Sequence, residues 1–164
     1  MNKLILTTSL LTVASFSALA QDTFTSSVYG AYANYENVDQ YNVVGSYYFS
    51  PVSTRKGPLG EAVFLNRSNS INAGFSHAAI DFGGNSFSSN SWSIGGTVHV
   101  EDSGLFLNGA IAQANGSDRG YYGLGAGYYL SKDWSVSINT DFDEDLEYRG
   151  VSVDTKKLYD LGGD

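Results

Sequence analysis

The stretch WSVSINTDFD, residues 134–143, alternates apolar and polar side chains with a period of two. Trp134, Val136, Ile138 and Phe142 fall on one side with Thr140, whereas serine, asparagine and aspartate occupy every position between them. Successive side chains of a β-strand point to opposite faces, while a helix would mix the two sets. The stretch therefore predicts a strand with one apolar face and one polar face.

The same alternation recurs along the chain. It is clear in residues 40–49, 91–100 and 121–130. Weaker patterns predict four more strands, namely Thr25–Tyr35, a single crossing within Leu59–Phe82, Leu105–Ala114 and Leu146–Val153. The chain also has 19 glycines, 12 tyrosines and only 2 prolines, a balance that favours sheets. We therefore predict an all-β, antiparallel fold of about eight strands.

The N-terminus has the three parts of a secretory signal peptide. Lys3 precedes the mainly apolar residues 4–16, and the small residues Ala18 and Ala20 come before the polar Gln21. This pattern predicts that residues 1–20 are removed and that residues 21–164 form one domain. No stretch of that domain has the roughly 18 consecutive apolar residues of a transmembrane helix.

An exported chain with period-two strands can be a transmembrane β-barrel. A strand that crosses the outer membrane needs only about 9 to 11 residues, with apolar side chains toward lipid and polar ones toward the interior. A soluble β-sandwich shows the same alternation and is the alternative. The signal peptide and the abundance of serine, glycine, asparagine and aspartate on the polar faces favour the barrel. We therefore expect an antiparallel transmembrane β-barrel in the outer membrane.

The strand faces identify candidate functional residues. Polar side chains of two clear strands are expected to face the lumen: Ser91, Ser93, Thr97, His99, Ser135, Ser137, Asn139 and Asp141. Aromatic side chains near strand ends on the apolar faces are expected to form girdles at the membrane interfaces. These are Tyr41, Tyr47, Trp92, Tyr122, Tyr128 and Trp134.

The residues give no sign of catalysis or of cofactor binding. The two histidines, His77 and His99, have no neighbouring nucleophile in a recognisable motif, so no enzyme is predicted. The acidic run 141–147 places Leu146 where an EF-hand loop requires glycine, so no metal site is predicted either. Gly123, Gly125 and Gly127 recur every second residue, as in a strand and unlike a phosphate-binding loop.

The formal net charge at pH 7 is −8. Phosphate binding requires clustered lysine and arginine, so this charge argues against nucleic acid as a partner. Carboxylates that face a water-filled lumen would favour cations over anions, as rings of charge do in channels. The acidity thus predicts a weak preference for cations if the chain encloses a pore.

Two blocks of sequence carry a resemblance to a known family. Residues 47–52, YYFSPV, together with residues 56–67, KGPLGEAVFLNR, resemble the general bacterial porin family of Gram-negative outer membranes. Residues 123–130, GLGAGYYL, are similar to a strand found in many outer-membrane barrels. The resemblance implies a barrel through which small hydrophilic solutes diffuse passively, with no catalytic residues and no cofactor. The partners it implies are these solutes and outer-membrane lipid, and it leaves a homo-oligomer open.

The C-terminal residues depart from the family pattern. The chain ends LYDLGGD, residues 158–164, whereas such barrels end on a strand with a terminal aromatic residue. We therefore expect C-terminal strands to be missing and the barrel to be incomplete. Because about eight strands leave an interior mostly filled by side chains, a small structural or adhesive barrel without an open channel is the alternative function.

Overall fold

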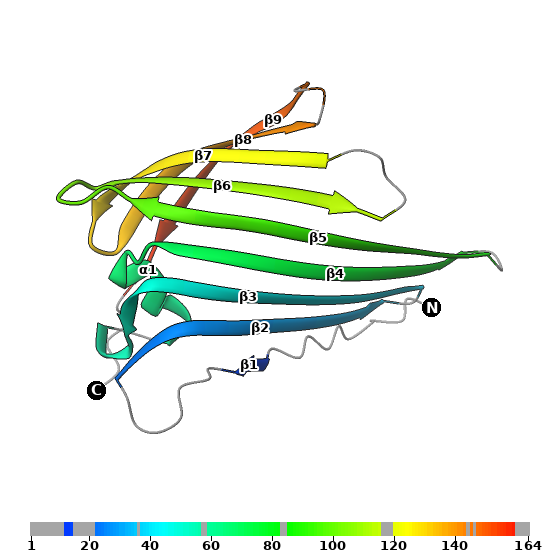
Figure 1. Cartoon of the computed structure of the whole chain (residues 1–164), viewed down its shortest axis with the longest axis horizontal. Helices are drawn as coiled ribbons and strands as arrows, with labels where there is room; N and C mark the ends of the chain where they lie inside the picture. The colour runs from blue at the N-terminus through cyan, green and yellow to red at the C-terminus, as the bar shows by residue number, and fades with distance from the viewer. Residues whose placement is uncertain are drawn as a thin grey trace.

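The computed structural model describes residues 12–14, 22–35, 37–56, 59–82, 85–115, 120–143, 145 and 147–159. They form one antiparallel sheet in which the strand order follows the chain from β1 to β9 (Figure 1). The strands are β1 Thr12–Ala14, β2 Thr23–Tyr35, β3 Val38–Ser53, β4 Ser70–Phe82, β5 Asn85–His99, β6 Leu105–Ala114, β7 Gly120–Ser131, β8 Trp134–Asp143 and β9 Tyr148–Lys157. The predicted all-β, antiparallel fold is confirmed, and β2 to β9 are the eight strands expected after residue 20.

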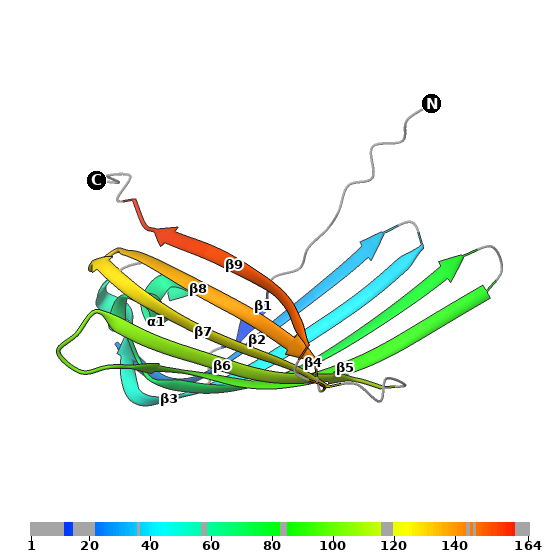
Figure 2. The same ribbon diagram turned by 90° about the horizontal axis from the view of Figure 1, so that it is seen from above.

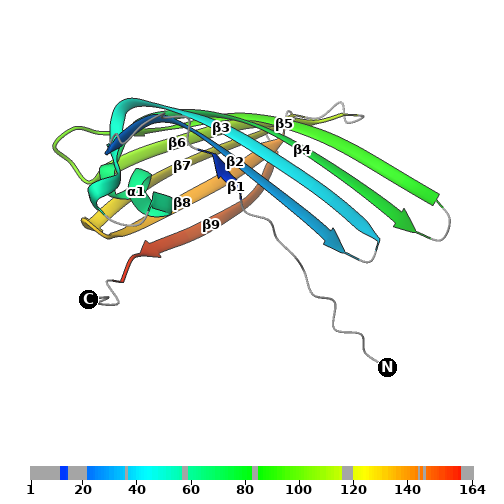
Figure 3. The same cartoon turned by 90° about the horizontal axis from the view of Figure 1, so that it is seen from below.

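The sheet is curved and does not close on itself. It forms a trough, with α1 on the concave side (Figures 2 and 3). Within the described part of the chain, β9 pairs only with β8, and β2 pairs with β3 and with the short β1. β1 lies inside the predicted signal peptide, whose removal stays a prediction and would leave β2 at the edge of the sheet.

Several strand bounds differ from the sequence predictions. β5 begins at Asn85, six residues before the start of the predicted strand 91–100. Residues 85–90, which are polar except for Phe87, pair with β4 all the same, because an antiparallel neighbour satisfies their backbone groups whatever their side chains are. β3 likewise continues to Ser53.

Residues 59–82 contain a single strand, as predicted, but the first half of this range is not part of it. Two short helices replace it, η2 Leu59–Glu61 and α1 Ala62–Asn66, and a third, η1 Thr54–Lys56, directly follows β3. Four consecutive apolar residues, 62–65, cannot alternate between two faces, and helical turns bury Ala62. Arg67 then ends α1 in a left-handed conformation, with φ at 51°. We call residues 59–69 the inserted segment.

The amide of Asn66 fixes the inserted segment to the end of β3. It donates to the carbonyls of Ser53 at 2.8 Å and Ala62 at 2.7 Å, and its oxygen accepts the Ser53 N–H at 3.2 Å. Beside it, Phe24, Tyr48, Val52 and Ala62 form a small buried cluster against which Val63 packs. This cluster is the hydrophobic core of the described residues, so the core lies at one end of the trough and not along its length.

The register divides the sheet into two faces. Directly paired residues share a face, so the pairs Tyr47↔Ile71, Ile94↔Ile111 and Ala126↔Ile138 belong to one face. We call it the apolar face. The opposite face carries Thr97↔Asn108 and Gly125↔Asn139, and we call it the polar face. The inserted segment contacts Tyr129 and Lys156 of the polar face, which is therefore the concave one.

Candidate functional site

All eight residues predicted to face the lumen lie on the polar face. They occupy alternate positions of β5 and β8, and the register connects the two strands through β6 and β7 along the row Thr97↔Asn108↔Gly125↔Asn139. The predicted residues are Ser91, Ser93, Thr97, His99, Ser135, Ser137, Asn139 and Asp141. They thus belong to one continuous concave surface, and their exposure to a closed lumen stays a prediction.

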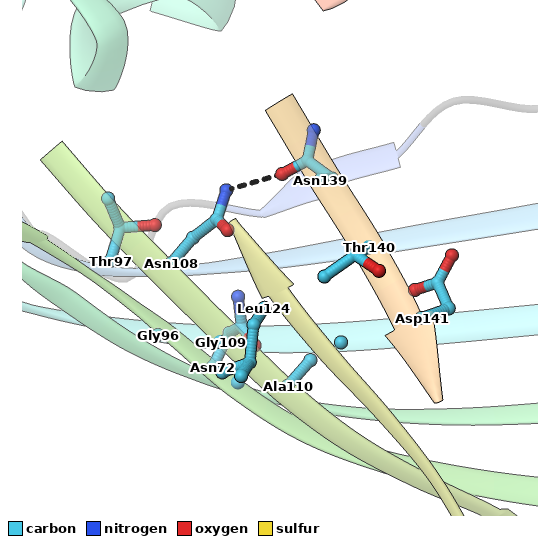
Figure 4. A pocket seen from close by; sticks show the side chains of 12 residues that line it. Asn72, Gly96, Thr97, Asn108, Gly109, Ala110, Leu124, Asn139, Thr140 and Asp141 are labelled. Atoms are coloured by element: carbon cyan, nitrogen blue, oxygen red, sulfur yellow. Dashed lines mark hydrogen bonds between the residues drawn. The ribbon is translucent and has the colours of Figure 1, made fainter. Parts of the chain in front are cut away.

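A hollow of about 300 Å³ lies in the middle of this surface (Figure 4). Its polar side chains come from four strands: Asn72, Thr97, Asn108, Asn139, Thr140 and Asp141. Its floor consists of small residues, among them Gly95, Ala110 and Gly123. We call it the polar hollow. Among the described residues, the one charged side chain that lines it is the carboxylate of Asp141.

The amides of Asn108 and Asn139 meet across β7 because the residue between them has no side chain. Asn108 Nδ2 donates to Asn139 Oδ1 at 3.2 Å (Figure 4). The register places Gly125 between these two residues. A Cβ at Gly125 would overlap both amide oxygens. Asn139 Nδ2 also donates to Asp154 at 2.7 Å, and Ser152 Oγ donates to the same carboxylate oxygen at 3.1 Å. Hydrogen bonds therefore hold the Asn139 side chain on both sides.

Aromatic rings occupy the polar face closer to the inserted segment. The ring centroids of Phe106 and Tyr129 are 5.3 Å apart, those of Phe64 and Tyr129 are 5.1 Å apart, and His99 lies 5.8 Å from Phe106. We call Phe64, His99, Phe106 and Tyr129 the ring cluster. Phe106 lies over Gly127, where a Cβ would overlap its ring. His99 is therefore packed among rings, and Ser135 beside the cluster is buried.

Polar contacts anchor the inserted segment to β7 and β9. The Arg67 guanidinium lies 4.1 Å from the Tyr129 ring centroid and donates to the Ser131 carbonyl at 3.1 Å. Lys156 Nζ lies 2.5 Å from Glu61 Oε2 and 4.9 Å from the centre of the Phe64 ring. The segment thus bridges strands that are distant in the sheet, across the concave side of the trough.

The sequence analysis missed part of this surface. Asn72 and Asn108 belong to the strands with weaker patterns, although each falls at a polar-face position once the register is known. Asn108 interrupts the apolar residues 105–112, which is the one signal that could have singled it out. Phe64 and Arg67 were read as part of a strand. Their place against Tyr129 depends on a contact between residues about sixty positions apart.

The six predicted girdle residues all lie on the apolar face and are exposed there. Their positions drift in one direction across the sheet. Measured along β5, Tyr41 is level with Asn90, to which it is connected through His77. Trp92 lies two residues further along β5, and Tyr122 is level with Ile94, two residues beyond Trp92. Such a drift keeps the rings level when strands are tilted, as in barrels. The predicted residues are Tyr41, Tyr47, Trp92, Tyr122, Tyr128 and Trp134.

The two histidines lie on opposite faces, so they cannot serve one site. His77 is on the apolar face, where its Nδ1 lies 2.6 Å from Asn90 Oδ1, and His99 is in the ring cluster. Among the residues that the structure describes, no group of three or more histidine, cysteine, aspartate or glutamate side chains is placed to hold a metal. No helix in the described ranges is long and apolar enough to cross a membrane.

Comparison with known proteins gives one match. A family model described as "Putative general bacterial porin" matches residues 1–141, and no curated protein and no solved structure matches the chain. The match covers most of the chain and includes the polar hollow and the ring cluster. The family indicates a channel in the bacterial outer membrane, not an enzyme. The chain belongs to the general bacterial porin family.

Proposed function

We propose that residues 21–164 form part of the wall of an outer-membrane barrel through which small hydrophilic solutes diffuse passively, with a weak preference for cations. The observation that carries this proposal is the contrast between the two faces. Large apolar side chains stay exposed on the convex face, whereas amides, hydroxyls and carboxylates surround a hollow on the concave one. A soluble protein of this size would bury the first face and expose the second.

Outer-membrane lipid is the proposed partner of the apolar face. Its exposed fractions include 56% for Val98, 59% for Leu124 and 71% for Val153. Transfer of such surface out of water is favourable by roughly 25 cal/mol per Å². Contiguous apolar patches of more than a few hundred Å² mark protein or membrane contacts. The six girdle residues support lipid, because they lie where tilted strands would bring rings to the interfaces.

The contents of the trough bear on the width of the proposed pore. A closed barrel of about eight strands has room for little more than its own side chains. The concave side here holds α1 and the ring cluster in addition to the polar hollow. An open pore therefore requires more strands than β2 to β9 around it, and a second copy of the chain that pairs β9 with β2 is one source of them. This is the sense in which we propose a homo-oligomer.

The distribution of charge supports the proposed cation preference. Asp141 lines the polar hollow and Asp154 borders it through Asn139. Two cations on the concave side, Arg67 and Lys156, lie against the rings of Tyr129 and Phe64 at the other end. Carboxylates that face water in a pore favour cations, while cations packed on rings and ion-paired contribute less to the potential there.

A structural or adhesive barrel without an open channel is the second candidate. The observation that favours it is the inserted segment, which extends from the end of β3 to Tyr129 and Lys156 and covers one end of the concave surface. If the barrel is narrow, this segment would close it. The family match and the apolar and polar faces fit both candidate functions, so a measurement of ion conduction is needed to distinguish them.

The test is single-channel recording of the refolded residues 21–164 in a planar bilayer. Stable ohmic steps are expected, with a reversal potential across a salt gradient that indicates cation preference. Replacement of Asp141 by asparagine should shift this potential toward zero. Bilayers that stay silent, although the chain is inserted and folded, would favour the structural barrel. Conductance steps with anion preference would refute the proposed cation preference but would still support an open pore.

A further inference from the structure

The polar hollow contains hydrogen-bonding groups that the protein does not use. Among the described residues, the side chains of Asn72, Thr97 and Asp141 make no hydrogen bond, although all three line the hollow. Asn108 and Asn139 form one hydrogen bond with each other through their side-chain amides. Several donors and acceptors are therefore available around a floor of small residues. Free hydrogen-bonding groups are thus gathered at one place on the concave face, where they could bind a solute together.

We propose that the polar hollow is a weak binding site for a neutral polyhydroxylated solute of about monosaccharide size. The inference rests on the proposed function, because the hollow would meet such a solute only as the solute passes along the concave face. It names the solute class that this part of the wall retains.

The chemistry of the lining selects hydroxyl groups. An asparagine amide offers both donors and an acceptor, and a threonine hydroxyl both donates and accepts. A solute hydroxyl also both donates and accepts, so it can pair with the donors or with the acceptors of the lining. An ammonium group only donates and would leave the amide N–H groups without a partner. A carboxylate or phosphate would be repelled by Asp141.

Size and rigidity agree with this class. The hollow, of about 300 Å³, lies at the lower end of the range for small-molecule sites, which is about 300–1,000 Å³. The Asn108 and Asn139 amides are fixed in place by their mutual bond and by Asp154, so a solute need not order them. Nothing among the described residues covers the hollow. Binding should therefore be weak, as transport requires, because a solute must also leave.

The experiment is an NMR titration of the ¹⁵N-labelled chain, residues 21–164, refolded in detergent micelles, with D-glucose as the probe. The side-chain amide signals of Asn72, Asn108 and Asn139 should shift and saturate, with a dissociation constant in the millimolar range. The amide of Asn42 is the internal control, because it lies on the same face at β3, outside the hollow. Equal shifts at Asn42 and at the hollow would overturn the proposal.

Three variants sharpen the result. Asn139→Ala removes a central amide and should weaken glucose binding about fivefold, the value of a typical hydrogen bond. Asn42→Ala should leave binding unchanged. Asp141→Asn keeps the hydrogen-bonding capacity without the charge, so glucose should still bind. If Asn139→Ala fails to refold, Asn72→Ala takes its place, since the Asn72 side chain makes no internal hydrogen bond among the described residues.

L-lysine is the competing probe. If its ammonium groups produced the larger shifts, and Asp141→Asn abolished them, the hollow would be a cation site and the proposal would be wrong. The outcome is also separate from that of the pore. Saturable glucose shifts without conductance would support the site and count against the channel, whereas conductance without such shifts would overturn the site alone.

Discussion

The polar hollow and the ring cluster lie side by side on one face of the sheet, and they differ in what fills the space above a glycine. Gly125 and Gly127 are two residues apart on β7 and therefore occupy positions on the same face of the sheet. Asn108 and Asn139 meet over the first, and Phe106 covers the second. The side chains of the neighbouring strands therefore decide whether the surface beside a glycine is a polar hollow or a packed ring cluster.

The largest effect is expected from removing the centre of the ring cluster. Tyr129 is 7% exposed and contacts Phe64, His99 and Phe106, so Tyr129→Ala should lower the free energy of unfolding by about 3 kcal/mol. Tyr121→Ala on the same strand and face is the matched control, because Tyr121 is 45% exposed and should cost under about 1 kcal/mol. Urea unfolding in detergent measures both. Equal losses would mean that the cluster is not a stabilising core.

Next in size is a direct comparison of the two glycines. Gly127→Ala forces the Phe106 ring out of the cluster and should cost about 1 to 3 kcal/mol, as overpacking does. Gly125→Ala only turns two asparagine ends apart and should cost about 1 kcal/mol, the value of one hydrogen bond. The same unfolding measurement applies. If Gly125→Ala cost more than Gly127→Ala, the distinction between the ring cluster and the polar hollow would be wrong.

A smaller effect is expected where the inserted segment is anchored to β9. Lys156→Ala removes the ion pair with Glu61 and the contact with the Phe64 ring, at a cost of about 0.5 to 1 kcal/mol because both side chains are partly exposed. Amide hydrogen exchange in residues 60–66 should quicken. Lys157→Ala, whose cation lies over the Trp134 ring outside the segment, should leave that exchange unchanged.

The smallest effect concerns the turn between β7 and β8. Ser131 Oγ donates to the Asp133 carboxylate at 2.5 Å, which lowers the pKa of Asp133. A lowered pKa in the folded state contributes stability at higher pH, and this contribution is lost as the pH falls through that pKa. Ser131→Ala should therefore raise the pKa of Asp133 in an NMR titration. Lys132→Ala should raise it less, since that charge acts more weakly.

Much of the sheet could be predicted from the sequence, because the side-chain period of a strand is local. Trp134, Ile138 and Asn139 fall on the predicted faces once the register is known. The inserted segment could not be predicted in this way, since Phe64 and Arg67 owe their place to Tyr129, on a strand far along the chain. The same holds for the hollow. It depends on Asn108 and Asn139 meeting over Gly125, which a single strand does not reveal.

The central claim is that the apolar face meets lipid and the polar face meets water. The chain contains no cysteine, so single cysteines at Ile138 and Asn139, adjacent residues on opposite faces, test it with one label. In a bilayer, Asn139→Cys should react with a membrane-impermeant fluorescent maleimide, whereas Ile138→Cys should not. When the same fluorophore is attached to Ile138→Cys before insertion, brominated lipid should quench its fluorescence. Equal reactivity at both positions, or the reverse pattern, would contradict the account.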